Sequence, residues 1–485
     1  MGILSGLNPK VVWEYFEEIC KVPRQSKKEE KIIQFLLDFG KSNNLDTKRD
    51  EIGNVLISKP ATQGRENTKT VVLQSHIDMV CEANEGTSHN FDTDPIQPVI
   101  DGEWIKAKGT TLGADDGIGI AAQMAILTST DIEHGPIECL FTVDEETGLT
   151  GAFALQPDFF KGKILINLDS EDEGELFIGC AGGIDTLINF DYEKETIPED
   201  YVALKVSVTG LNGGHSGDEI DKGLGNSIKI MNRFLWNANN EFNLRIGDFD
   251  GGRARNAIPR EAFAHIVIPT NEKQDFIALF NDFAPAVKAE LQTTEPKLEL
   301  AIQDADLPKF VIDEDTQFAL LNSLYACPHG VYAMSNDIKG LVETSTNLAS
   351  IKFNESNIHI TTSQRSSVES AKYDIASKVE SVFILAGAEV EHGDGYPGWK
   401  PDTNSEIMKI TEDSYFRLFN KKPIVRAIHA GLECGLFLEK YPYLDMISFG
   451  PTIKGAHTPE ERINIETNVK FWDLLLDVLK NIPEN

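Results

Sequence analysis

Three apolar segments of the sequence end in side chains that can bind a metal ion or accept a proton. The residues at these ends are His76 and Asp78 after residues 70–75, Glu145 and Glu146 after residues 137–143, and Asp169 after residues 163–168. The apolar composition of each segment favours a buried strand. An α/β sheet usually places its chemistry at the carboxyl ends of such strands. One acidic turn after a strand is common, but three strand ends with these residues predict a shared site.

Two adjacent aspartates, Asp115 and Asp116, precede an apolar helix expected over residues 120–127. An aspartate is a good N-cap and is favoured at the positive end of a helix dipole, so capping is one explanation. Two aspartates exceed what one cap requires, and a role as a metal ligand is the alternative. A further candidate, His457, lies in the stretch 450–461 that precedes the last expected helix.

These residue types suit a metal site with two ions. Two histidines with several carboxylates favour zinc, or manganese or cobalt, over calcium, which prefers oxygen ligands alone. Five protein ligands exceed what one catalytic zinc with an open position uses, so two metals that share one carboxylate are the natural number. Adjacent side chains diverge, so one of Glu145 and Glu146 can bind metal while the other acts as a base toward water.

Helical and strand patterns alternate along the first part of the chain, which indicates an α/β core with a largely parallel sheet. The character then changes: residues 201–209 alternate between apolar and other side chains, as a half-solvated antiparallel strand does. Similar series of elements occur twice between residues 186 and 395, which we interpret as two small α/β units. We therefore expect a first domain made of residues 1–185 and 396–485, with residues 186–395 inserted into it.

The composition narrows the class of protein. A formal net charge of -32 argues against nucleic acids and anionic membrane surfaces as partners. The six cysteines are widely spaced without a C-x-x-C motif, which fits a reducing compartment. No signal-peptide pattern opens the sequence, and no apolar run approaches the ~20 residues of a membrane span. We expect a soluble cytoplasmic protein.

Five short motifs, in order along the chain, resemble those of a known family. They are His-x-Asp at 76–78, Gly-Ala-Asp-Asp-Gly at 113–117, Asp-Glu-Glu-Thr-Gly at 144–148, Asn-Leu-Asp-Ser-Glu at 167–171 and Gly-Ala-His at 455–457. Together they resemble the co-catalytic zinc peptidases of the carnosinase and aminoacylase clan. The stretch His-Ala-Gly-Leu-Glu-Cys-Gly at 429–435 is typical of the branch of bacterial aminoacyl-histidine dipeptidases. The resemblance extends over nearly the whole chain.

The resemblance implies a role for each residue of the cluster. His76 and Asp169 would hold one metal, and Glu146 and His457 the other, with Asp115 bridging the two. Glu145 would be the general base and acid. Asp78 would steady the ring of His76, as metal-bound imidazoles generally require.

The resemblance also implies that the inserted segment is a lid on the catalytic domain. His215, in Gly-Gly-His-Ser-Gly, would face the oxyanion of the tetrahedral intermediate. In many relatives this histidine comes from the lid of a partner subunit, so a homodimer formed through the lid is one expectation; a doubled lid that supplies it within one chain is the other. Asn256, Arg365 and Gly431 are candidates for binding the ends of the substrate, and Glu433 is a further pocket candidate beside His429 without an assigned role.

The implied function is hydrolysis of unblocked dipeptides, with a preference for Xaa-His that includes β-Ala-His. A hydroxide bridging two metals, most favourably zinc, would attack the peptide carbonyl while Glu145 transfers the proton. The alternatives are a tripeptidase, an acylamino-acid deacylase, a dipeptidase without histidine preference, or a non-catalytic protein that binds dipeptides or metal on the same scaffold. A divalent-cation buffer would require acidic repeats, which the sequence lacks.

Overall fold

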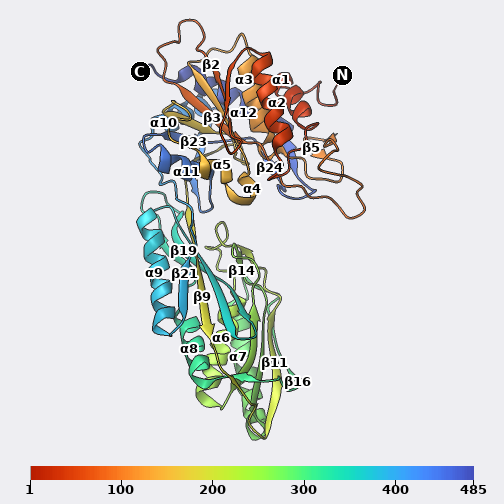
Figure 1. Ribbon diagram of the computed structural model, residues 1–485, viewed down its shortest axis with the longest axis vertical. Coiled ribbons are helices and arrows are strands. Elements are labelled where there is room, and N and C mark those ends of the chain that lie inside the picture. Colours follow the sequence, from red (N-terminus) through yellow and green to blue (C-terminus); the bar gives the residue numbers. More distant parts are fainter. Residues whose placement is uncertain (1) are drawn as a thin grey trace. The chain divides into compact units, whose positions relative to one another are not determined.

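Two large β-sheets organise the chain, one in each of the two units into which it divides (Figure 1). The computed structural model describes residues 2–485. Unit 1 contains the chain up to Cys180 together with Trp399–Ala427 and Leu432–Asn485. Unit 2 contains Ala181–Gly398 and Ile428–Gly431. The expected fold class, an α/β domain interrupted by an inserted α+β segment, is confirmed.

The sheet of unit 1 has eight strands. In sheet order they are β1 (Asp46–Arg49), β2 (Val55–Lys59), β6 (Ile137–Thr142), β3 (Val71–His76), β7 (Ile164–Asn167), β23 (Asp445–Ser448), β8 (Glu175–Cys180) and β22 (Ile424–Ile428). The four central strands, β6, β3, β7 and β23, are parallel to one another, and β1, β2 and β8 pair antiparallel. Every residue of β3, β6 and β7 is buried, as expected for parallel strands covered on both faces.

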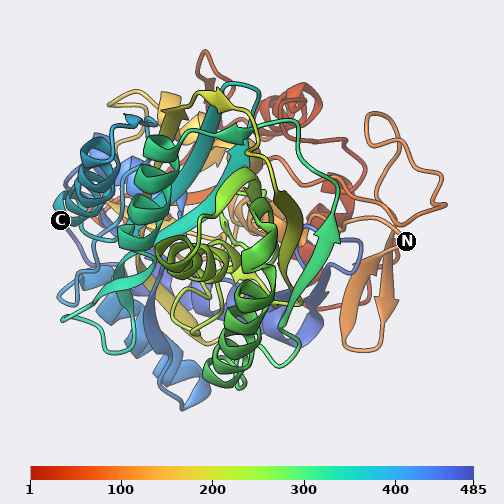
Figure 2. The same ribbon diagram turned by 90° about the horizontal axis from the view of Figure 1, so that it is seen from below.

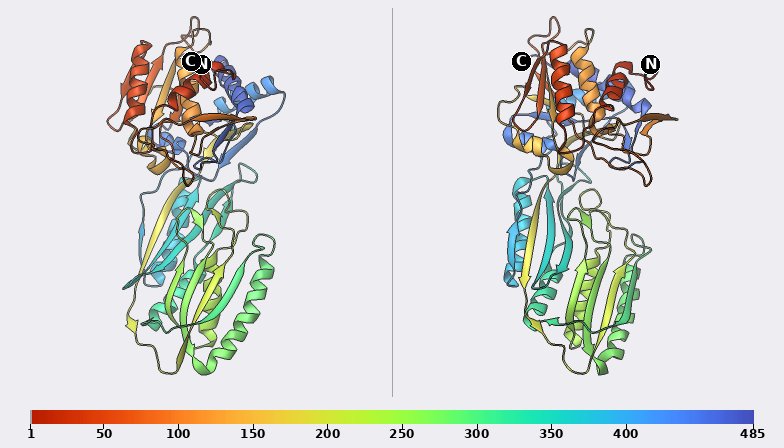
Figure 3. Two further views of the ribbon diagram at one scale, coloured as in Figure 1. Left: turned by 90° about the vertical axis from the view of Figure 1, so that its right-hand side faces the viewer. Right: turned by 45° about the vertical axis from the view of Figure 1, so that its right-hand side comes forward.

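Helices cover this sheet. They are α1 (Lys10–Ile19), α2 (Glu30–Ser42), α3 (Ala114–Thr128), α4 (Glu145–Gly148), α5 (Thr150–Ala154), α10 (Glu406–Phe419), α11 (Glu433–Lys440) and α12 (Ile465–Asn481). The helix α3 packs on β3 and against α1, while α10 packs on β23 and against α12. Figure 3 shows the red and orange helices on one side of the unit 1 sheet and blue helices on the other.

A small four-stranded sheet in unit 1 holds the segment that contains His457. Its order is β24 (Ile453–Lys454), β25 (Arg462–Asn464), β5 (Trp104–Ala107) and β4 (Pro98–Asp101). β24 and β25 pair antiparallel, so residues 455–461 form the connection between them. β25 also pairs with β5, which anchors residues 453–464 on the part of the chain that precedes α3.

Unit 2 is built on a nine-stranded sheet. Eight strands follow in the order β16 (Glu299–Ala305), β11 (Tyr201–Thr209), β15 (Ala262–Pro269), β13 (Arg245–Gly251), β19 (Val342–Phe353), β20 (Asn357–Ser366), β9 (Gly182–Asp191) and β21 (Glu389–His392), and β18 (Gly330–Met334) pairs with β19. The predicted alternating strand at 201–209 is β11, which pairs antiparallel with β15 and β16. One register pair, Gly251 with Ile351, joins β13 to β19 in the middle of the sheet.

Four helices pack against this sheet: α6 (Ser227–Glu241), α7 (Lys273–Glu290), α8 (Glu314–Ala326) and α9 (Glu369–Leu385). Figure 2 views unit 2 along its strands, with its green helices beside the sheet. The apolar residues that alternate along β11, including Leu204 and Val206, are buried in one core with residues of α6 to α9. Among residues 2–485, no helix combines the length and apolar composition needed to cross a bilayer.

Candidate metal centre

Three neighbouring parallel strands position the first residues of the cluster. β6, β3 and β7 are adjacent in the sheet, and His76 at the end of β3 is the register partner of Thr142 at the end of β6. Glu145 and Glu146 open α4 just after β6, and Asp169 follows β7. The carboxyl ends of these strands therefore meet at one edge, as the sequence predicted.

Two groups of candidate ligands share Asp115. In the first, Nε2 of His76 lies 2.9 Å from Oδ1 of Asp115 and 3.5 Å from Oδ1 of Asp169. In the second, Nε2 of His457 lies 3.2 Å from Oδ2 of Asp115 and 2.9 Å from Oε2 of Glu146. The candidate ligand atoms of each group lie within 4.8 Å of one another. Each oxygen of Asp115 thus faces a different histidine, which is the arrangement a bridging carboxylate needs.

Asp78 connects the ring of His76 to the start of α4. Its Oδ1 lies 3.4 Å from Nδ1 of His76 and accepts a hydrogen bond from the amide of Glu145 (3.0 Å). Its Oδ2 accepts from Oγ of Ser26 (2.8 Å) and from the amide of Glu146 (3.2 Å). Burial alone would raise the pKa of Asp78, but these hydrogen bonds and the His76 ring outweigh it and hold the pKa below its ordinary value.

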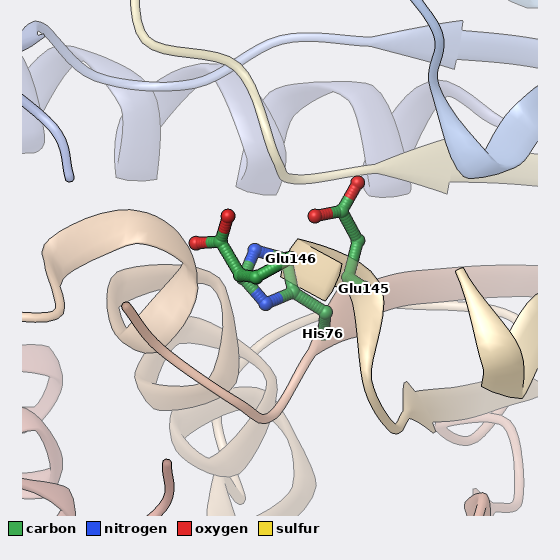
Figure 4. A group of neighbouring side chains, drawn as sticks. All are labelled: His76, Glu145 and Glu146. Carbon is green, nitrogen blue, oxygen red and sulfur yellow. The ribbon is translucent and has the colours of Figure 1, made fainter. Parts of the chain in front are cut away.

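The two glutamates of α4 point in different directions. Figure 4 shows Glu145 and Glu146 diverging, so that their carboxyl groups reach separate places near the imidazole of His76. Glu146 faces His457 through Oε2, while its Oε1 is buried and has no hydrogen-bond partner among the described residues. One glutamate is therefore available as a ligand and the other as a base.

Crowding of carboxyl groups shifts their pKa values. Burial, followed by Asp169 and other nearby carboxylates, holds the pKa of Glu145 well above its ordinary value. Burial also raises the pKa of Asp169 to about 7 and that of Glu171 to about 8, and the charge of Asp115 adds to both. Negative charge is therefore in excess over the two imidazoles of the cluster.

Divalent metal ions fit this donor set. The cluster offers two imidazole nitrogens and carboxylate oxygens, and within each group the possible ligand atoms lie within 4.8 Å of one another. One buried carboxylate oxygen, Oε1 of Glu146, has no hydrogen-bond partner within residues 2–485. Cations would also offset the excess of carboxylates, since a bound divalent ion is the largest local charge in such a site.

A row of buried polar side chains crosses the sheet next to the cluster. Gln74, Asn167 and Ser448 are register partners on β3, β7 and β23, joined by hydrogen bonds from Asn167 to Gln74 (2.6 Å) and from Ser448 to Asn167 (2.5 Å). Oε2 of Glu433 ends the row, accepting from Gln74 (2.6 Å) and from Oγ1 of Thr142 (2.8 Å). Glu433, the pocket candidate without an assigned role, is thus fully buried at the end of this row.

Two further buried charged residues lie beside the cluster and were not among the expected site residues. Arg24 donates to the backbone oxygens of Ile77 (3.2 Å) and Asp78 (2.8 Å), and Glu461 accepts from backbone amides at the start of α3. The sequence carries no signal for Glu461, because the adjacent Glu460 is the same residue type and is exposed.

His215 lies in unit 2 on β12 (Gly214–His215), and Asn256 directly precedes the partner strand β14 (Ala257–Ile258). The amide of Ser216 donates to the carbonyl of Asn256 (2.8 Å). Nδ1 of His215 lies 3.3 Å from Oδ2 of Asp218, which fixes the orientation of the ring. The backbone amide of Asp218 donates to Nδ1 of His215 (3.2 Å), so Nδ1 is the acceptor and the ring proton is on Nε2, which can act as a donor.

Arg365 and Gly431, also in unit 2, meet at Tyr396. Nη1 of Arg365 donates to Oη of Tyr396 (3.1 Å), and a Cβ at Gly431 would lie 2.8 Å from the Tyr396 ring. His429 is buried beside them, with Nε2 2.7 Å from Oγ of Ser345. Burial, together with the charge of Arg365, lowers the pKa of His429 to about 3, so its ring is neutral.

Comparison with known proteins gives consistent matches along the chain. The model of peptidase family M20/M25/M40 matches residues 72–481. The cytosol non-specific dipeptidase of Escherichia coli (strain K12) is 45% identical over 483 residues, which cover 100% of each chain. The crystal structure of aminoacylhistidine dipeptidase from Vibrio alginolyticus aligns with a TM-score of 0.93 and 46% identity, covering 100% of this chain and 99% of that one. Aminopeptidase PepT from Bacillus cereus ATCC 10987, with a TM-score of 0.58 and 17% identity over 98% of this chain and 99% of its own, shares the fold.

Proposed function

Because the chain belongs to peptidase family M20/M25/M40, we propose that it hydrolyses the peptide bond of unblocked dipeptides with two divalent metal ions. The observation that carries this proposal is the pair of candidate ligand groups in unit 1 that share Asp115. Two metal ions bridged in this way are well suited to hydrolysis of an amide bond. The names of the two full-length relatives, both dipeptidases, support a dipeptide as the substrate.

We assign one metal to His76 and Asp169 and the other to Glu146 and His457, with Asp115 as the ligand of both. Imidazole and carboxylate donors suit zinc, with manganese or cobalt as alternatives. When bound, the two ions would polarise the substrate carbonyl and lower the pKa of a water molecule.

Glu145 is proposed as the residue that moves the proton. Its raised pKa, caused by burial and by neighbouring carboxylates, suits a carboxyl group that accepts a proton from water and then donates it to the leaving amine. Asp78 would hold the His76 ring through Nδ1, leaving Nε2 for the metal.

The substrate-binding residues are proposed to come from unit 2. His215 would donate a hydrogen bond to the oxyanion from Nε2, because the backbone amide of Asp218 donates to Nδ1 and the ring proton is then on Nε2. Arg365 suits the terminal carboxylate of a dipeptide, since a guanidinium binds a carboxylate with two parallel hydrogen bonds. Asn256 and Gly431 are proposed to bind the remaining polar groups of the substrate. These residues would act in their own chain or, in a homodimer formed through unit 2, in the partner subunit.

The preference for Xaa-His dipeptides, including β-Ala-His, is also proposed. The names of the two full-length relatives differ on this point, one being a non-specific dipeptidase and the other an aminoacylhistidine dipeptidase. The name of the former supports a cytosolic location.

A substrate panel tests the proposal. Purified, zinc-loaded protein is assayed with Gly-His, β-Ala-His, Gly-Leu, Gly-Gly-His and N-acetyl-His, with amine release as the readout. We expect hydrolysis of the unblocked dipeptides, a higher kcat/KM for Gly-His than for Gly-Leu, and little turnover of the tripeptide and the blocked amino acid. Equal rates for Gly-His and Gly-Leu would rule out the preference for a C-terminal histidine but leave the dipeptidase assignment standing. Faster turnover of Gly-Gly-His or N-acetyl-His than of any dipeptide would overturn the dipeptidase assignment.

A further inference from the structure

The carboxylate of Glu461 accepts hydrogen bonds from four consecutive backbone amides. Oε2 accepts from Leu112 (2.7 Å) and Gly113 (2.9 Å), and Oε1 accepts from Ala114 (2.7 Å) and Asp115 (3.3 Å). Glu461 is 2% exposed, and it forms no ion pair within the described part of the chain. Its charge is therefore stabilised by these amides.

The start of α3 needs such a partner from elsewhere in the chain. The first amides of a helix have no partner within the helix and are usually satisfied by an N-cap side chain. Here the N-cap residue is Gly113, which has no side chain, and its φ of 68° is left-handed. The backbone at Asp115 (φ −79°, ψ 112°) and Asp116 is also non-helical. Gly117 donates to the carbonyl of Gly113 (3.2 Å), but the amides of Ala114 and Asp115 have their acceptor in Glu461.

Glu461 belongs to the same connection as His457. Residues 455–461 link β24 to β25, and this connection carries a candidate metal ligand at one point and the carboxylate that holds Asp115 at another. One short segment thus sets the position of His457 and the backbone of Asp115 together.

Arg24 holds the same turn from its other side. Its Nη2 donates to the carbonyl oxygen of Gly113, while Nη1 donates to the carbonyl oxygens of Ile77 and Asp78. The amide of Gly113 is bound by Glu461 and its carbonyl by Arg24, so the peptide groups on both sides of this residue are fixed. Arg24 also connects this turn to the end of β3, which carries His76.

We propose that Glu461 is a positioning residue of the metal centre, whose carboxylate holds the Leu112–Asp115 backbone so that Asp115 faces His76 and His457 at once. This proposal rests on the proposed function, because it takes these three residues as metal ligands. A carboxylate is required, since all four amides are donors and need two accepting oxygens. A glutamine would turn its own N–H groups toward two of the amides and lose half of the acceptors.

Glu461→Gln is the test, and Glu460→Gln is its matched control from the adjacent exposed position. Zinc affinity is measured by competition with a chromophoric chelator, at a temperature where circular dichroism shows each variant to be folded. Deuterium uptake is measured for the peptide covering residues 110–117 of the metal-free protein. Loss of residues that orient metal ligands typically lowers metal affinity 10–100-fold. We expect a loss of about that size and faster exchange in this peptide for Glu461→Gln, with Glu460→Gln within twofold of the wild type.

A folded Glu461→Gln variant with wild-type zinc affinity would overturn the proposal, whatever its effect on the melting temperature. If that variant does not fold, Glu461→Asp replaces it, because it keeps the charge but is too short to reach all four amides. Weaker zinc binding by Glu461→Asp supports the proposal and unchanged binding contradicts it. Zinc binding is measured without a substrate. A wild-type protein that binds zinc but cleaves no dipeptide would therefore contradict the proposed function, while the comparison of zinc affinities would still test the role of Glu461.

Discussion

At the scale of single residues, the metal centre depends on short contacts that leave little room for change. Asp115 uses each carboxylate oxygen toward a different histidine, and Asp78 accepts from two amides of α4 while it touches the His76 ring. Residues that hold ligands in this way commonly matter almost as much as the ligands themselves. The effect of a substitution on metal binding or stability therefore depends on the atoms that contact the replaced side chain.

Gly113→Ala should destabilise the protein by more than the strain of placing an alanine in a left-handed backbone conformation. A Cβ at Gly113 would lie 2.5 Å from Nη2 of Arg24 and 2.8 Å from Sδ of Met79, and Arg24 is held in place by its hydrogen bonds. Gly102 has a similar φ, +62° against +68°, but a Cβ there would meet nothing within 4 Å. We expect Gly102→Ala to cost about 1–2 kcal/mol for the left-handed backbone and Gly113→Ala clearly more.

Urea unfolding of the metal-free variants measures this difference. Equal losses for the two variants would mean that the contacts of Gly113 with Arg24 and Met79 do not restrict this position. Zinc titration of Gly113→Ala should also show weaker binding, because the turn that carries Asp115 would have to shift.

At the scale of helices and strands, adjacent parallel strands explain how much of the site the sequence predicts. A candidate ligand or base stands at or just after the end of each of β6, β3 and β7, and the carboxyl ends of parallel strands meet at one edge, so His76, Glu145 and Asp169 were expected together. Asp115 and His457 come from a helix start and a loop, for which local patterns give no spatial neighbour. They were candidates by residue type, and only the family resemblance gave them their roles as the bridging ligand and a ligand of the second metal.

The remaining residues of the site could not be predicted, because tertiary contacts define them. Glu460 and Glu461 are indistinguishable by type and neighbourhood in the sequence, yet one is exposed and the other binds four amides. The carboxylate of Glu433, a pocket candidate without an assigned role, ends a buried polar row across four strands, and no local sequence pattern indicates these contacts. Burial of a charged group beside a sheet depends on which distant segment covers it.

His329 connects α6 to β19 and should make the stability of unit 2 depend on pH. Its Nδ1 accepts from the amide of Leu348 (3.3 Å) and lies 3.4 Å from Nδ2 of Asn226, the N-cap of α6. Burial, with a smaller effect of Lys229, lowers the pKa of His329 to about 4 from an ordinary value of 6.5. Between these values the unfolded chain binds the proton more readily, so stability falls as pH decreases from about 6.5 to about 4.

His329→Gln, which keeps an acceptor, should weaken this dependence. We expect the slope of unfolding free energy against pH to be smaller in the variant by up to ~1.4 kcal/mol per pH unit in that window, and equal to that of the wild type above pH 7. Chemical denaturation at a series of pH values measures both slopes. Parallel curves down to pH 4 would show that His329 is protonated equally in the folded and unfolded states.

At the scale of the whole molecule, the candidate ligands all lie in unit 1, while unit 2 has a separate hydrophobic core. Ligands that bind only a folded unit stabilise that unit by mass action, by about 4 kcal/mol per site at a thousandfold excess over Kd. Removal of metal by EDTA should therefore lower the unfolding temperature of unit 1 and leave that of unit 2 nearly unchanged. Differential scanning calorimetry with and without EDTA measures this. Equal shifts of two resolved transitions would contradict the assignment of the metals to unit 1.

The two units also show how much of the domain organisation sequence patterns can predict. The alternation along residues 201–209 indicated a change of architecture after the first domain, and β11 indeed lies in the antiparallel sheet of unit 2. The return of the chain for Ile428–Gly431 was not predicted, since four residues carry no composition signal of their own.

If the protein is a two-metal peptidase in which Glu145 moves the proton, Glu145→Gln should keep the metals and lose turnover. Hydrolysis of Gly-His and β-Ala-His is measured with the metal content of the same samples of wild type and variant. We predict about two metals per chain in both proteins and a turnover about 10²–10⁴-fold lower in the variant, the usual contribution of a general base. A variant that keeps wild-type turnover, or a wild type that hydrolyses dipeptides without tightly bound metal, would contradict this mechanism.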